Sequence, residues 1–199
     1  HALFCPSGQR MAFLHRWVPR NPMGRRSRLF TCDLEGKDWH LFSTREMVSH
    51  LGWRDARQLA AYCRLPDGRD RYVLFADGDP AATRILGERL FSSDGHPSFS
   101  PDGRWMLTDT YPDRMRRAWL VLFDTTTGRR YNIAQLRSPR RFASKYPDRH
   151  WACDLHPRFD RRGRYLCFDS AHTGRRALCT IDLGEDRLAR EPEALSICG

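Results

Sequence analysis

The sequence has 199 residues, and its 34 lysines and arginines, almost all of them arginine, outnumber the 24 aspartates and glutamates. A chain of this length can bury a sizeable core, and no stretch approaches the ~20 consecutive apolar residues of a membrane-spanning helix. The composition therefore excludes a helical membrane protein and predicts a soluble one. The net charge of +10 favours an acidic partner, because guanidinium groups pair well with carboxylates. An arginine-rich codon usage would give the same excess.

The seven cysteines form no C-x-x-C pair, and several stand inside apolar runs such as RYLCFD at 164–169. An odd number without a framework predicts buried thiols rather than disulfides. We therefore expect a reducing compartment, the cytoplasm. The sequence begins with histidine, and its first ten residues resemble the inside of a folded repeat, so we expect a fragment. A periplasmic or secreted location stays open for that reason.

Four segments of the chain align with one another without a gap, and each begins with a histidine. In chain order they are HALFCPSGQRMAF from residue 1, HLGWRDARQLAAY from 50, HPSFSPDGRWMLT from 96 and HPRFDRRGRYLCF from 156. An aromatic residue stands three positions after each histidine. A glycine stands seven positions after it in every copy but the second. An apolar run follows each time, so the four histidines occupy one repeat position.

Each copy continues with a turn, a second apolar run, a charged loop and two more strand-like runs, as in AWLVLFDTTTGRRY from residue 118. Four short strands repeated in this way are typical of β-propeller blades. The sequence therefore predicts an all-β fold of four-stranded antiparallel blades, forming a single partial propeller domain. The expected blades cover about 1–48, 49–94, 95–153 and 154–199. Blades of this length usually occur in larger rings, so we expect a seven- or eight-bladed parent.

The repeated histidines point to a site at the centre of the ring. The first strand of each blade lines the central channel, so His1, His50, His96 and His156 should converge there. The alternative is structural, because a histidine repeated in this way could hydrogen-bond the neighbouring blade. Its presence in all four copies without a substitution favours a functional site.

The loop after the second strand of each blade should open on the same face as the histidines, and all four loops are basic. They span residues 15–28, 64–71, 109–117 and 169–176. They predict a mouth rimmed by arginines that binds a carboxylated or sulfated ligand, although solvated surface loops can have the same composition. The candidate ligand-binding residues are His1, His15, Arg16, Tyr111, His172 and Arg175.

The segment RHWACDLHPR at 149–158 collects metal-binding residue types just before the fourth repeat. Asp154 and His156 are two positions apart, so they would share one face of an extended strand. His96 should reach them across the channel. Two histidines and a carboxylate suit Mn²⁺, Zn²⁺ or a related ion. Cys153 would be a soft ligand for zinc, but it should point to the other face.

These blocks resemble the oligogalacturonate lyases, a family of seven-bladed propellers, and more loosely the propeller-type ulvan lyases. The likeness covers nearly the whole chain: AFLHRW with RLFTCDLEG, then VSHLGWRD, DGHPSFSPDG and CDLHPRFDRRGRYLCFDSAHTG. Turns of the SPDG type are shared with TolB-like and peptidase propellers, so the order of the histidine blocks carries the resemblance. It implies a lyase that cleaves uronate-containing oligosaccharides by β-elimination. The expected partner is an acidic oligosaccharide, with neither nucleic acid nor membrane.

The resemblance also implies roles for single residues. From its place in the VSHLGW block, His50 would be the base that removes the proton α to the uronate carboxylate, and Arg28 would assist. A divalent metal, Mn²⁺ or alternatively Zn²⁺ or Ca²⁺, would be held by His96, Asp154 and His156.

The last block departs from the family's pattern. Asp154 replaces a histidine there, and Trp151 lies near the position of an expected glutamine. The chemistry is coherent with the residues, since a metal and arginines would neutralise the C6 carboxylate while an imidazole takes the C5 proton. Tyr111, His172 and His15 are candidate proton donors to the leaving C4 oxygen.

Two further hypotheses remain. A non-catalytic TolB-type propeller would bind a protein or glycan and use the histidines as structural caps. The lyase needs His50 unpaired and facing the mouth, whereas a cap would be hydrogen-bonded between blades. The propeller of a prolyl-oligopeptidase-like enzyme would require a hydrolase domain with a G-x-S-x-G motif, and the sequence contains none.

Overall fold

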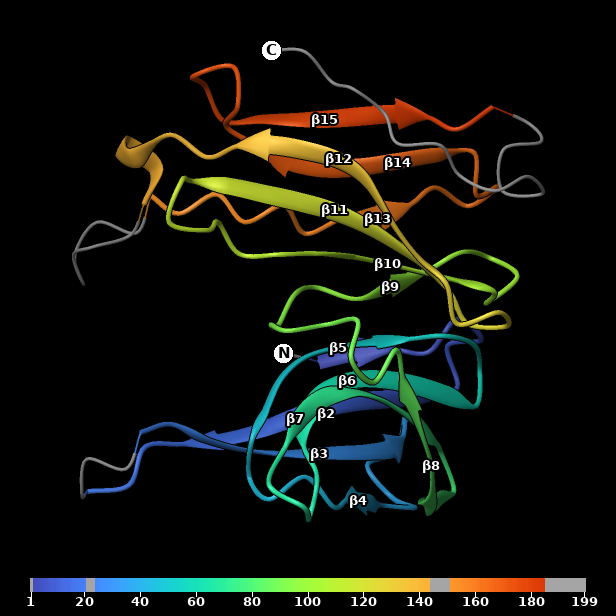
Figure 1. Ribbon diagram of the computed structural model, residues 1–199. Helices are drawn as coiled ribbons and strands as arrows, with labels where there is room; N and C mark the ends of the chain where they lie inside the picture. The colour runs from blue at the N-terminus through green and yellow to red at the C-terminus, as the bar shows by residue number, and fades with distance from the viewer. Residues whose placement is uncertain (1, 21–23, 144–150, 185–199) are drawn as a thin grey trace. The chain divides into compact units, whose positions relative to one another are not determined.

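The computed structural model describes residues 2–20, 24–143 and 151–184, and their regular structure is almost entirely β-strand (Figure 1). The chain divides into two compact units, His1–Asp94 and Gly95–Gly199. Each unit holds two antiparallel sheets whose strands follow one another in chain order, which confirms the expected all-β propeller fold. Within these ranges the one helical element is the 3-10 turn η1 (Arg140–Phe142), and no helix is long and apolar enough to cross a membrane.

The first unit contains eight strands in two sheets of four. The first sheet consists of β1 (Ala2–Phe4), β2 (Arg10–Trp17), β3 (Arg26–Asp33) and β4 (His40–Phe42). The second sheet consists of β5 (Val48–Trp53), β6 (Gln58–Arg64), β7 (Asp70–Ala76) and β8 (Asp79–Leu86). Short turns join β1 to β2, β6 to β7 and β7 to β8. The turn before β7 contains Gly68 at φ 84°, a left-handed conformation that glycine adopts without steric cost.

Apolar side chains from both sheets form the core of the first unit. Leu29 and Phe42 of the first sheet pack with Leu59 and Phe75 of the second, and the rings of Phe42 and Phe75 lie 5.0 Å apart. Cys63 is fully buried in the same cluster. This burial raises the pKa of its thiol to about 12, so the group stays protonated at neutral pH.

A partly buried polar network also links the two sheets of the first unit. Asp77, between β7 and β8, accepts hydrogen bonds from Arg10 Nε at 2.7 Å and from the Thr31 hydroxyl at 2.5 Å. His40 Nδ1 lies 3.3 Å from the same carboxylate. Burial raises the pKa of Asp77, but the hydrogen bonds from Arg10 and Thr31 outweigh it and hold the pKa below its usual range. Asp77 is therefore a charged acceptor at neutral pH.

The second unit contains a four-stranded and a three-stranded sheet in its described part. The first consists of β9 (Ser98–Phe99), β10 (Trp105–Asp109), β11 (Arg117–Asp124) and β12 (Arg130–Arg137). The second consists of β13 (Arg158–Phe159), β14 (Tyr165–Ser170) and β15 (Ala177–Asp182). Residues 185–199, the last part of the expected fourth blade, lie outside the described residues.

The core of the second unit again comes from facing apolar positions of its two sheets. Leu107, Leu120 and Leu122 of the first sheet cluster with Leu166 and Phe168 of the second. The six described cysteines of the chain are all free, as expected, and four of them are buried. Cys198 lies outside the described residues.

Candidate metal centre

The three predicted metal ligands meet in the second unit. His96 stands just before β9, and Asp154 and His156 stand just before β13. Each offers one ligand atom within 4.8 Å of the other two, and the two imidazole rings are 3.8 Å apart. His96 is buried, Asp154 is half-buried and His156 is exposed. The cluster is therefore held by the protein on one side and open to solvent on the other.

The local backbone differs from the expected extended strand. Asp154 and His156 lie in an irregular segment, and His156 has a left-handed φ of 45°. The prediction that the two residues share one face of a strand is therefore wrong. Their approach depends on the turn, in which the His156 amide donates a hydrogen bond of 3.2 Å to the Asp109 carboxylate.

Asp109 is the residue that holds this centre together. It ends β10, is buried, and accepts a hydrogen bond of 2.7 Å from the His96 amide. Its two oxygens also lie 2.9 and 3.0 Å from His96 Nδ1. A carboxylate on Nδ1 fixes the proton on that nitrogen and orients Nε2 toward a metal.

The charge of Asp109 follows from the same contacts. Burial raises the pKa of its carboxyl, but the hydrogen bonds from His96 and from the His156 amide outweigh burial, and the pKa lies below its usual range. The sequence analysis missed this residue. In the sequence, Asp109 is marked only as the carboxylate that ends the apolar run WMLTD. In the structure it stands at the end of β10, which lies beside the start of β9.

Gly95 allows the backbone before His96 to approach β10 closely. A Cβ atom at this position would lie 2.0 Å from the carbonyl oxygen of Asp109 and 2.8 Å from the Thr108 hydroxyl. Real Cβ atoms do not approach backbone this closely, so any side chain would move the segment that carries His96. The absence of a side chain at Gly95 therefore determines the position of His96, a candidate metal ligand.

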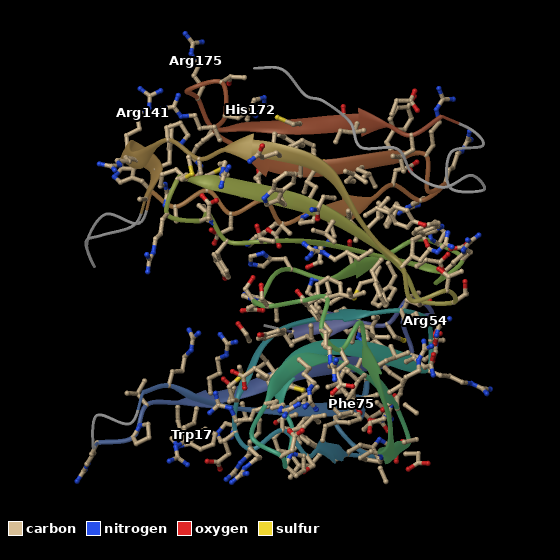
Figure 2. All side chains as sticks on the ribbon, in the orientation of Figure 1. Trp17, Arg54, Phe75, Arg141, His172 and Arg175 are labelled. Carbon is tan, nitrogen blue, oxygen red and sulfur yellow. The ribbon has the colours of Figure 1, made fainter. Side chains whose placement is uncertain are left out.

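The remaining candidates of the second unit lie in the expected loops. Tyr111 follows β10, is 42% exposed, and sets its ring edge-on to His96 with 5.7 Å between the ring centroids. His172 and Arg175 belong to the loop between β14 and β15 (Figure 2). His172 Nδ1 is hydrogen-bonded to the Ser170 hydroxyl at 2.8 Å, and Arg175 is exposed. Of the three, Tyr111 is the one shown in contact with a metal-ligand candidate.

His50 belongs to the first unit and lies within β5. Its Nδ1 is 3.0 Å from the Asp94 carboxylate and 3.1 Å from the Ser49 hydroxyl, which also bonds Asp94. His50 is therefore not unpaired, contrary to the condition expected for a lyase. The same carboxylate contact, however, is what orients a histidine that acts as a base through Nε2. Asp94 was missed, although it stands two residues before His96 in the DGH motif.

The basic residues near the start of the chain lie on strands rather than in the predicted loop 15–28. His15 and Arg16 are in β2 and Arg28 is in β3, because the β2–β3 pairing continues to Trp17 and Arg26. Arg16 donates a hydrogen bond of 2.6 Å to the carbonyl of Ser49.

Arg28 and His15 share an aromatic neighbour. The Arg28 guanidinium lies 4.8 Å from the Trp17 ring centroid, and the His15 ring stacks on Trp17 at 5.1 Å. Arg28 also pairs with Glu46 at 2.5 Å. Hydrogen bonds from Arg26 and Arg28 lower the pKa of Glu46, so Arg28 faces a carboxylate of the protein itself. His1, the remaining candidate, lies outside the described residues.

The chain is similar in fold to several proteins of known structure. No family model and no curated protein matches the chain. TolB from Acinetobacter baumannii is similar with a TM-score of 0.66 and 20% identity, over 89% of this chain and 40% of that one. Oligogalacturonate lyase in complex with manganese gives a TM-score of 0.50 and 15% identity, over 90% and 64%. Acylaminoacyl peptidase from Pyrococcus horikoshii gives 0.56 and 11%, over 89% and 30%.

The chain spans less than two thirds of the length of each of these proteins. Identities of 20% or less show a shared fold and no more. The neighbours carry different activities, since a lyase and a peptidase stand beside TolB. The comparisons therefore show that the chain has the fold of the β-propeller proteins, a fold common to oligogalacturonate lyase and to TolB.

Proposed function

We propose that the chain belongs to a metal-dependent lyase that cleaves uronate-containing oligosaccharides by β-elimination. The observation that carries this proposal is the cluster of His96, Asp154 and His156, with His96 oriented by the buried Asp109. Two imidazoles and one carboxylate suit Mn²⁺ or Zn²⁺, whereas Ca²⁺ prefers oxygen ligands. Manganese is also the ion named with oligogalacturonate lyase, one of the similar structures.

The residues of the second unit would bind the acidic end of the substrate. His96, Asp154 and His156 would hold a divalent ion, whose positive charge would favour loss of the proton α to the uronate carboxylate. Asp109 keeps the His96 ring in place during this step. Tyr111, whose ring contacts His96, is our candidate to protonate the leaving C4 oxygen.

The first unit carries the proposed base. Asp94 holds the proton on Nδ1 of His50, which makes Nε2 the nitrogen that accepts the C5 proton. Arg28 would assist by pairing with the substrate carboxylate. Because Arg28 is bonded to Glu46, an incoming carboxylate has to compete with that contact.

The test is to incubate the full-length protein with oligogalacturonate and related uronic oligosaccharides in the presence of Mn²⁺. Formation of the unsaturated product is followed by its ultraviolet absorbance. His96→Ala should lose both metal binding and turnover, whereas His50→Ala should lose turnover and keep metal binding. Arg161→Ala, an exposed change, is the control. Absence of product from every uronate would refute the lyase, and normal turnover in His50→Ala would assign the base elsewhere.

A non-catalytic TolB-like propeller that binds a protein or glycan is the second candidate. The observation that favours it is the pairing of His50 with Asp94 and Ser49, as expected for a structural histidine. If His50 is structural, His50→Ala should destabilise the first unit toward urea, because Asp94 would lose its half-buried partner. Unfolding of His50→Ala at the wild-type urea concentration would argue against the structural role.

A further inference from the structure

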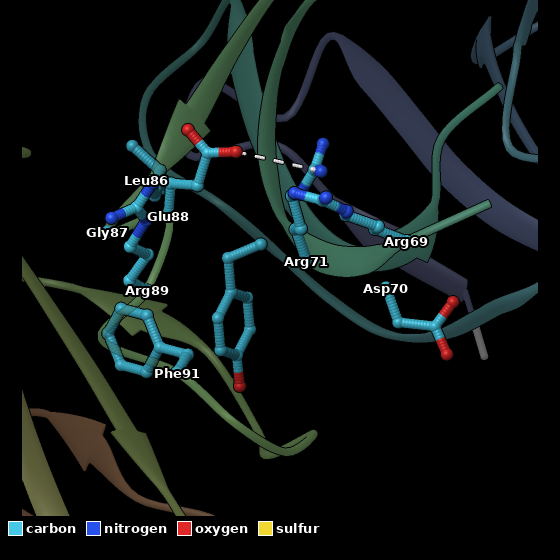
Figure 3. Close-up of a pocket in the computed structure, with 9 residues that line it drawn as sticks. Arg69, Asp70, Arg71, Leu86, Gly87, Glu88, Arg89 and Phe91 are labelled. Carbon is cyan, nitrogen blue, oxygen red and sulfur yellow. Dashed lines mark ion pairs between the residues drawn. The ribbon is translucent and has the colours of Figure 1, made fainter. Parts of the chain in front are cut away.

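A cavity of about 150 Å³ lies at one end of the second sheet, among residues that the proposed lyase reaction does not use (Figure 3). Its walls come from residues 69–72 at the start of β7 and from residues 86–89 and 91 at the end of β8. The two strands pair here through Tyr72 and Leu86. We propose that this cavity binds an oxyanion, the carboxylate, sulfate or phosphate of a small acidic ligand.

The acidic groups around the cavity already have basic partners. Asp70 accepts two hydrogen bonds from Arg64, from Nε at 2.6 Å and from Nη2 at 2.9 Å. Arg71 pairs with Asp67 at 2.6 Å and lies 3.6 Å from Glu88, the ion pair drawn in Figure 3. Two guanidinium groups therefore face three carboxylates, and each carboxylate has an arginine beside it.

Two further arginines, Arg69 and Arg89, stand on the walls. In the part of the chain that the structure describes, the guanidinium groups of Arg69 and Arg89 form no ion pair and no hydrogen bond. They come from the two opposite wall segments, one before β7 and one after β8 (Figure 3). With these two arginines, four guanidinium groups stand against the three carboxylates, so the cavity has one net positive charge, and a concave wall concentrates the field of such a charge.

Two aromatic rings also line the cavity. Tyr72 is 1% exposed, and its ring meets that of Phe91 edge-on with 5.0 Å between the centroids. Phe91 is half-buried and offers a surface on which the ring of a ligand can lie. The volume is below the ~300–1,000 Å³ of sites for drug-sized ligands. It therefore suits one acidic group with few attached atoms, such as a single sugar acid or an inorganic oxyanion.

This inference is independent of the proposed lyase, because the cavity contains neither the metal ligands nor His50. Arg69 and Arg71 come from the basic segment 64–71, for which the sequence predicted a carboxylated or sulfated ligand. Residues 69–71 of that segment line the cavity.

The experiment is a ¹H–¹⁵N NMR titration of the protein with sodium sulfate, sodium phosphate and galacturonate, with galactose as the neutral counterpart of galacturonate. All titrations use one low ionic strength, because salt screens exposed charges. The anions should shift the amide signals of residues 69–72 and 86–91, and galactose should leave them in place. The anion with the lowest Kd identifies the preferred oxyanion.

The matched variants are Arg69→Ala/Arg89→Ala in the cavity and Arg161→Ala/Arg162→Ala on an exposed turn, which remove the same charge. Loss of two charge-assisted contacts should raise Kd by about tenfold or more in the first variant and leave it unchanged in the second. Equal weakening by both variants, shifts with galactose, or no anion-induced shift at these amides would each overturn the proposal. A negative lyase assay would not affect this result.

Discussion

Asp109→Asn removes one charge at the metal centre and keeps the shape of the side chain. The carboxylate accepts bonds from His96 Nδ1 at 2.9 Å, from the His96 amide at 2.7 Å and from the His156 amide at 3.2 Å. Asparagine has one accepting oxygen, and its amide nitrogen would face a donor. At least one buried donor therefore loses its acceptor. Hydrogen bonds to a charged group contribute ~1.5–3 kcal/mol each, so we expect the free energy of unfolding of the second unit to fall by about 2 kcal/mol.

Two measurements check this expectation. With a urea dependence of roughly 2 kcal/mol/M, the unfolding midpoint should shift down by about 1 M in circular dichroism. Isothermal titration with Mn²⁺ should show an affinity ~10–100-fold weaker, the usual effect of losing the partner of a metal-binding histidine. Asp113→Asn is the control, because Asp113 pairs with Arg117 on the surface. Wild-type Mn²⁺ affinity and midpoint in Asp109→Asn would refute the role assigned to Asp109.

Three other changes give further tests. Gly95→Ala should lower the free energy of unfolding by about 1–3 kcal/mol, because its Cβ would collide with the Asp109 carbonyl; a wild-type urea midpoint would contradict the close approach. Leu107→Ala removes a fully buried core side chain and should cost about 2–5 kcal/mol in the same assay. The lowered pKa of Asp77 gives stability that is fully present above its unfolded pKa of ~3.9 and is lost as the pH falls through the lower folded value. Asp77→Asn should flatten this acid limb, and an unchanged limb would exclude Asp77 as its source.

The repeat in the sequence predicted the sheets well because each blade uses the same pattern of strands and turns. It placed His96 and His156 beside the first strands of two adjacent sheets, and the structure brings these residues together. The repeat could not show Asp94 or Asp109. These carboxylates lie outside the aligned blocks. The pairing of β9 with β10 brings Asp109 to His96, and the fold of the chain between residues 50 and 94 brings Asp94 to His50.

The prediction was less successful where charged residues stand on strands. Arg16 and Arg28 suggested a loop, but backbone pairing extends the β2–β3 hairpin past them. Charged side chains are compatible with a strand when one face is open to solvent or when a partner such as Glu46 is nearby. The left-handed backbone of His156 was also invisible in the sequence, because a non-glycine residue with positive φ is uncommon.

The close contact at Gly95 has a consequence for how mutational tolerance is interpreted in this protein. Because even a methyl group would meet the Asp109 carbonyl, a saturation screen scored by activity should find position 95 as intolerant as the ligand positions. A ranking based on that score alone would count a residue without functional groups among the catalytic ones. Scoring the same library for folded protein would separate position 95 from His156, whose exposed imidazole can be replaced at little cost to folding.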